Sequence, residues 1–315
     1  MNVDEDDLSA DAGLPANIPQ LELLHHFTTS PDMAIPAGFS MINGQGLAQT
    51  MVKRGLSCEY LMNEILAFSA RHLAQVRPER CVFYSHQAKQ FQTHALGFFT
   101  RAQVTPTADN CLSILFFSWL LGTHLLCDLA MAEDNFGFLE QFHHYIEVYR
   151  GIRAVTSDTW KFLMEGEYRA LFQDGEAFAR GLGTGSQTCS LRDLIRDSLG
   201  LSDSEKAGAA DALARIQWVI DDYEEAGLAA ALPRVFNMVF SWPLIVTPDF
   251  VASLRRRRPE SVLVLAYFAV LLHWCRDHWI FRQVGRRLLR SVESGLGQGW
   301  ERWLQWPKEM IEKAD

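Results

Sequence analysis

From Pro19 to the C-terminus, apolar residues recur at the spacing of an α-helix, and no stretch alternates apolar and polar residues as a β-strand does. Helices with one apolar stripe must bury that stripe against each other. The sequence therefore predicts an all-α, single-domain helical bundle over residues 19–315. The preceding segment, residues 1–18, is acidic, contains no apolar run and is expected to be disordered.

Prolines, glycines and capping residues divide the helical region into predicted segments. Ser57, Asp109 or Asn110, and Asp158 are expected to cap helices. The S-D-S-E run from Ser202 predicts a capping box. Pro243 is expected to interrupt a helix, and Pro259 is expected to open one. The GLGTG run, residues 181–185, is predicted to be a loop because no strand precedes it. The predicted helices are Leu21–Ser30, Leu47–Lys53, Cys58–Val76, Arg80–Arg101, a helix from Cys111, Phe136–Tyr149, a short helix at Trp160, Ser202–Glu225, a helix after Asp249, Glu260–Trp279 and Gln283–Leu296.

Charge and cysteine spacing exclude two common roles. The formal net charge is −9, and the only basic run, residues 255–258, is short enough to be a solvated helix end, so no nucleic-acid partner is expected. The six cysteines are widely spaced and form no C-x-x-C, which argues against a structural zinc site and indicates a reducing, intracellular setting. The adjacent histidine pairs, 25–26 and 143–144, point about 100° apart on a helix and are not expected to share a metal.

The N-terminus has no signal or transit pattern, so a cytoplasmic location is expected. The apolar run CLSILFFSWLLGTHLLCDLAMA, from Cys111, is long enough to span a membrane. It contains serine, threonine, histidine and aspartate, which favours a buried helix of a protein without a membrane partner.

Four segments, in order along nearly the whole chain, resemble the C-terminal ligand-sensing (effector) domain of fungal binuclear zinc-cluster transcription factors of the sterol uptake control type. They are LELLHHFTTS from Leu21, YLMNEILAFSARHLA paired with YSHQAKQFQTHAL, FHHYIEVYRGIRAV with its aromatic–R–G–aliphatic–R motif at residues 149–153, and the long segment from Phe240 to Pro307. The resemblance implies a helical bundle with an enclosed apolar pocket near the C-terminal helices, which in that family holds a sterol. Family members carry a six-cysteine DNA-binding cluster before the first of these segments. Here about twenty residues precede it and none is cysteine, so with Met1 as the start no DNA binding of the family's kind is expected.

The sequence contains none of the short motifs that hold nucleotides, catalytic zinc or an activated serine, so no cofactor is expected. The candidate site comes instead from helix faces. One face of the predicted helix Glu260–Trp279 carries Tyr267, Leu271, Trp274 and His278. On the neighbouring face, His273 and Asp277 are spaced to pair, with the carboxylate orienting the imidazole. A structural, hydrogen-bonded core histidine fits the same pattern.

The apolar helix from Cys111 presents a second face with Trp119, Thr123 and Leu126, beside a possible His124–Asp128 pair. Aromatics with single polar groups among apolar residues suit an enclosed ligand site, although they also suit a plain core. The predicted ligand-binding residues are Trp119, Phe240, Trp242, Leu271 and Trp274, and the predicted polarising (catalytic) residues are His273, His278, Tyr267 and Thr123.

Three functions remain open, all with a hydrophobic small molecule (a terpenoid, polyketide or sterol) as partner. The first is a cofactor-free cyclase of fungal secondary metabolism, of the pericyclic, hetero-Diels–Alder type, in which an apolar cavity orients the substrate and hydrogen-bond donors polarise an oxygen. The second is a ligand-responsive regulator, acting in the nucleus as part of a transcription factor or as a partner that forms a homodimer. The third is a lipid carrier.

Overall fold

The computed structural model describes residues 16–33, 41–42, 45–131, 137–165 and 181–313, and these are almost wholly helical. The predicted all-α fold is therefore confirmed. Besides two short 3-10 turns, η1 (Pro31–Met33) and η2 (Pro78–Arg80), the described part contains one two-residue antiparallel pair, β1 (Met41–Ile42) with β2 (Gln45–Gly46). The helices are α1 (Ile18–Thr29), α2 (Leu47–Gly55), α3 (Glu59–Val76), α4 (Cys81–Arg101), α5 (Cys111–Met131), α6 (Phe138–Glu165), α8 (Cys189–Asp197), α9 (Asp203–Ala226), α10 (Leu228–Ile245), α11 (Pro248–Arg255), α12 (Pro259–Trp274), α13 (Val284–Leu296) and α14 (Glu301–Glu312).

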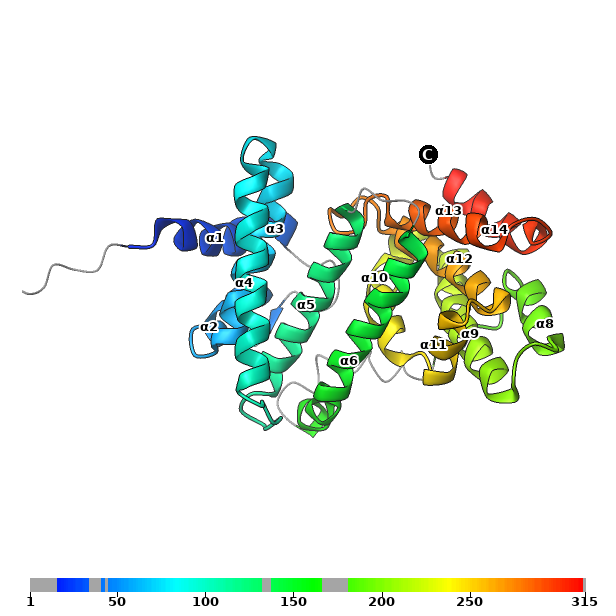
Figure 1. The fold of residues 1–315 in the computed structure, drawn as a ribbon, viewed down its shortest axis with the longest axis horizontal. Coiled ribbons are helices and arrows are strands. Elements are labelled where there is room, and N and C mark those ends of the chain that lie inside the picture. Colours follow the sequence, from blue (N-terminus) through cyan, green and yellow to red (C-terminus); the bar gives the residue numbers. More distant parts are fainter. Residues whose placement is uncertain (1–15, 34–40, 43–44, 132–136, 166–180, 314–315) are drawn as a thin grey trace, which may run out of the picture.

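The helices follow one another across the molecule (Figure 1). The α3–α4 hairpin with α1 and α2 forms one end, α5 and α6 cross the middle, and α8 to α14 form the other end. Helix α12 is the centre of that end, because every residue from Ser261 to Trp274 is buried. Such a helix has no polar face and is covered on all sides, here by α8, α9, α10, α11, α13 and α14. One contiguous apolar core runs from Phe27 of α1 to Ile311 of α14, which makes the bundle a single domain.

Several local predictions are confirmed. Ser202 and Glu205 form the capping box at the start of α9, each side chain bonding the other's backbone N–H. Pro259 lies in the first turn of α12, where its missing N–H costs nothing. Residues 181–185 form no regular element and lie against α9, where a Cβ on Gly183 would come 2.2 Å from the backbone nitrogen of Trp218. The glycines are thus needed for close approach to a helix.

Three predicted helix boundaries are wrong. Pro243 lies inside α10, near its C-terminal end, where only a final turn remains to be disturbed. Helix α6 runs without interruption to Glu165, so no helix begins at Asp158. Ser57 is not a cap: its hydroxyl donates to the carbonyl of Arg54, and Cys58 occupies the N-cap position of α3. Serine and aspartate also occur within helices, so the presence of either residue alone does not mark a helix boundary.

The predicted disordered segment, residues 1–18, lies outside the described residues except at its end, where α1 begins at Ile18. Two helices, α5 and α10, are long and apolar enough to cross a membrane by length and composition alone. Inside the fold, 67% of the tested window of α5 and 44% of that of α10 are buried. Helix α5 is therefore a core helix of the bundle, as the sequence predicts.

Replacing Gly285 with alanine is expected to lower the free energy of unfolding by about 2 kcal/mol. Gly285 is where α13 crosses α12, and a Cβ there would lie 2.5 Å from the carbonyl oxygen of Ala269 and 2.6 Å from the backbone nitrogen of His273. These are backbone atoms of a fully covered helix, so they cannot move aside. Urea denaturation of the variant measures the loss.

Gly295, in the same helix α13, is the matched control. A Cβ there meets only a leucine methyl of Leu139 at 3.4 Å, an ordinary contact. Gly295→Ala is expected to leave stability unchanged or to raise it by roughly 0.5 kcal/mol through helix propensity. Equal losses from both substitutions would show that the α12–α13 crossing is not the constraint.

Candidate functional site

An aromatic cluster at the junction of α3, α5, α10 and the turns after α12 contains three of the predicted site residues. Trp119 of α5 packs edge-on against Phe240 of α10, with ring centroids 5.9 Å apart. His278 reaches the same cluster through Phe236, at 5.6 Å, and through Phe281. The structure therefore brings together Trp119, Phe240 and His278.

Thr123 lies one turn after Trp119 on α5 and is completely buried. Its hydroxyl donates to the carbonyl oxygen of Trp119 at 2.8 Å. A threonine bonded to its own helix in this way has already used its proton donor.

The helical face predicted to carry His278 ends earlier than expected. Helix α12 stops at Trp274, and Cys275 to Phe281 form a series of turns. His278 therefore does not lie on the helix. His273 is buried in the last turn, whereas Asp277 is exposed. The predicted His273–Asp277 pairing depended on helical spacing that does not extend beyond Trp274.

The other predicted residues lie in separate packing clusters around α12. Tyr267 stacks on Trp306 of α14 at 5.5 Å and hydrogen-bonds Ser190, and burial raises the pKa of Tyr267 to about 12. Trp274 stacks on Tyr223 of α9 at 4.4 Å.

Trp242 stacks on Phe268 at 4.4 Å, and its indole N–H donates to the carbonyl of Ala212 at 2.9 Å. Leu271 is fully buried on α12. These contacts spread the predicted residues over several sides of one helix. The predicted enclosed pocket near the C-terminal helices stays a prediction.

A buried acid–imidazole pair joins α3 to α5, and the sequence analysis missed it. His124 Nδ1 lies 3.2 Å from Glu64 Oε1, and both side chains are almost completely inaccessible, at 1% and 0% exposed. The other carboxylate oxygen of Glu64 has no hydrogen-bond partner within the described residues. Asp128, the partner expected for His124, instead pairs with Arg71 at 2.7 Å. The available signal was Glu64 itself, a charged residue within the apolar stripe of α3.

A histidine cluster ties α1 and α3 to the turns after α12. His26 Nε2 and His72 Nδ1 are 2.8 Å apart, and the His72 ring packs on Trp279 at 4.6 Å. The Trp279 indole N–H donates to the backbone carbonyl of Asp32, whose carboxylate lies 3.8 Å from His72. Burial lowers the pKa of His26 and lowers that of His72 to about 4. Both imidazoles are therefore neutral at physiological pH.

An open cleft of about 370 Å³ lies between α5 and α6. Its walls are mainly apolar, and three polar side chains of its rim come from α6. The lining residues are Leu125, Asp128, Leu129, Glu140, Gln141, His144, Tyr145 and Val148. None of them was among the predicted site residues.

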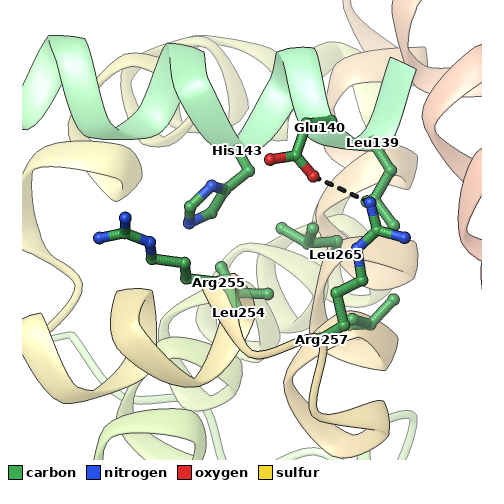
Figure 2. A pocket seen from close by; sticks show the side chains of 8 residues that line it. Leu139, Glu140, His143, Leu254, Arg255, Arg257 and Leu265 are labelled. Carbon is green, nitrogen blue, oxygen red and sulfur yellow. Dashed lines mark hydrogen bonds and ion pairs between the residues drawn. The ribbon is translucent and has the colours of Figure 1, made fainter. Parts of the chain in front are cut away.

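A much smaller recess lies on the other side of Glu140, beneath the start of α6 (Figure 2). His143 and Glu140 face Arg255 and Leu254 of α11, and Arg257 reaches Glu140 at 2.9 Å. Its volume, about 10 Å³, is enough for about one water molecule. The arginine run is a helix end, as predicted: Arg255 closes α11, and Arg256 and Arg257 pair with acidic side chains.

Metal-binding chemistry has no ready donor set in the described part of the chain, where no three histidine, cysteine, aspartate or glutamate side chains converge. The six cysteines are free thiols; Cys111 and Cys127 both lie on α5, and the other four lie in different segments of the chain. Burial raises the pKa of Cys127 and Cys275, so both remain protonated and unreactive.

The comparisons with known proteins give one distant relation. No family model matches the chain, and no solved structure matches it. The chain is 22% identical, over 91% of its length, to a protein of Gibberella zeae described as a Zn(2)-C6 fungal-type transcription factor. It spans 61% of the length of that protein. This similarity supports a relation to the fungal zinc-cluster transcription factors.

Proposed function

We propose that the chain is a regulatory domain of the fungal zinc-cluster transcription-factor type that responds to a hydrophobic small molecule. The observation that carries the proposal is the 22% identity to a Zn(2)-C6 fungal-type transcription factor across 91% of this chain. A match of that extent covers the helices from both ends of the bundle. The all-α fold and the open apolar cleft between α5 and α6 are compatible with a ligand-binding role.

The proposal assigns no DNA contact to the described residues. The protein has a net charge of −9, and two members of its arginine run, Arg256 and Arg257, are paired with Glu205 and Glu140. The carboxylate beside each of these arginines would repel a phosphate group. Regulation would therefore work through ligand binding and contacts with other proteins.

The cyclase hypothesis gains no support from the contacts or the comparisons. Two of its four polarising groups already have hydrogen-bond partners: Thr123 bonds its own helix and Tyr267 bonds Ser190. A group that polarises a reacting oxygen must instead direct its proton at the substrate. The carrier hypothesis has no specific observation in its favour either.

A reporter assay tests the proposal. The chain is fused to a heterologous DNA-binding domain, and reporter transcription is measured in fungal cells supplied with sterols, terpenoids or polyketides. The expected result is a several-fold, ligand-dependent change and a nuclear location, with the DNA-binding domain alone as control. A silent reporter combined with product formation by the purified chain would favour the cyclase instead.

A further inference from the structure

We propose that the cleft between α5 and α6 is the ligand site and that it takes a neutral, apolar small molecule. The inference rests on the proposed function for its regulatory meaning. Three features of the cleft support the site: its size, its apolar wall and the pairing of its charges.

The dimensions and wall of the cleft fit a small organic molecule. Its volume of about 370 Å³ lies within the range typical of small-molecule sites, roughly 300–1,000 Å³. Leu125 and Leu129 of α5 face Val148 and the Tyr145 ring of α6 across it. Covering these side chains with an apolar ligand removes hydrocarbon surface from water, which favours binding.

The charges beside the cleft favour a neutral ligand. Asp128 is paired with Arg71 at 2.7 Å, and Glu140 is paired with Arg257 at 2.9 Å. Each carboxylate of the cleft therefore already has its counter-ion. A charged ligand would lose water without gaining a new ionic partner, and desolvating an unpaired charge is costly.

Tyr145 contributes the edge of its ring to the cleft wall. Only 4% of its surface is exposed, and its hydroxyl oxygen has almost no accessible surface although the cleft is open to solvent. The hydroxyl therefore lies away from the cleft, and the ring adds to the apolar part of the wall.

Three fluorescent probes separate the parts of this proposal. Prodan is a neutral naphthyl ketone, N-phenyl-1-naphthylamine is neutral and has no carbonyl, and anilinonaphthalene sulfonate is an anion. Titration of the full chain is expected to show micromolar binding of the two neutral dyes and at least about tenfold weaker binding of the anion. Stronger binding of the anion than of either neutral dye would overturn the assignment of ligand charge.

Two substitutions locate the site. Val148→Trp fills the cleft and is expected to weaken both neutral dyes at least about tenfold. Tyr145→Phe is expected to leave the affinity for both neutral dyes unchanged, because the hydroxyl that it removes does not reach the surface of the cleft. The matched control is Val82→Trp, on the exposed face of α4, where Val82 is 86% exposed. Circular dichroism verifies folding, and Leu125→Gln replaces Val148→Trp if that variant does not fold.

Unchanged dye affinity in every cleft variant would overturn the proposal. A silent reporter together with cleft-dependent dye binding would leave the site standing and refute only the regulatory role. A ligand-responsive reporter that is insensitive to the cleft substitutions would refute the site and leave the regulatory role standing, because the ligand would then bind elsewhere.

Discussion

Replacing His124 with leucine is expected to lower the free energy of unfolding by about 3–5 kcal/mol, the cost of removing one member of a buried pair. Glu64 and His124 are both almost inaccessible, and the histidine ring nitrogen lies 3.2 Å from one carboxylate oxygen. The other oxygen is already without a hydrogen bond in the described structure. Without His124 the whole carboxyl group would be buried with no partner.

A double variant separates this cost from simple loss of packing. The double variant Glu64→Leu, His124→Leu removes both polar groups and is expected to be more stable than His124→Leu alone. His144→Leu is the control, because His144 is exposed on α6 and its removal is expected to change stability by less than about 0.5 kcal/mol. Urea denaturation measures all four proteins. A double variant less stable than the single one would mean that the pair is not the source of the loss.

Helix content was predictable because it depends on local periodicity. The apolar stretch of α12 predicted a helix, and the structure forms one and buries every residue from Ser261 to Trp274. The capping box of α9 and the proline at the start of α12 were readable from four or five residues each. The end of α12 could not be predicted from the sequence, because apolar residues continue through the turns that follow the helix.

The polar pairs inside the bundle could not be predicted because they join distant parts of the chain. His124 pairs with Glu64, sixty positions away, and not with Asp128 on the next turn. Periodicity identifies the face on which a side chain lies, but the partner on the neighbouring helix depends on how the helices cross. The histidine cluster has the same origin, since it joins α1, α3 and the turns after α12.

The candidate site was harder to predict, because core and pocket use the same residue types. Trp242, Tyr267 and Trp274 were selected as aromatics on apolar helices, and each stacks on a different neighbour. A helix buried all round has no single face that distinguishes a pocket. The α5–α6 cleft had a clearer signal, since Leu125 with Leu129 and Tyr145 with Val148 form short apolar ridges on consecutive helices.

Acidification is expected to destabilise the protein by about 3 kcal/mol between pH 6.5 and pH 4 through His72 alone. Burial lowers the pKa of His72 in the folded protein from 6.5 to about 4, and the nearby Asp32 carboxylate offsets only part of this shift. Above pH 6.5 the imidazole is neutral in both states and contributes nothing to the pH dependence. As the pH falls, the unfolded chain binds the proton first, so unfolding becomes easier until the folded protein is also protonated near pH 4.

The variant His72→Asn removes this titration while keeping a group that can hydrogen-bond His26. Its stability is expected to fall less steeply than that of the wild type over the same pH range, with a difference of about 3 kcal/mol in the total change. Urea denaturation at half-unit steps of pH gives both curves, and the same substitution at His94, exposed on α4, is the control. Parallel curves for wild type and His72→Asn would show that the neutral His26–His72 contact does not set the acid sensitivity of the junction between α1, α3 and Trp279.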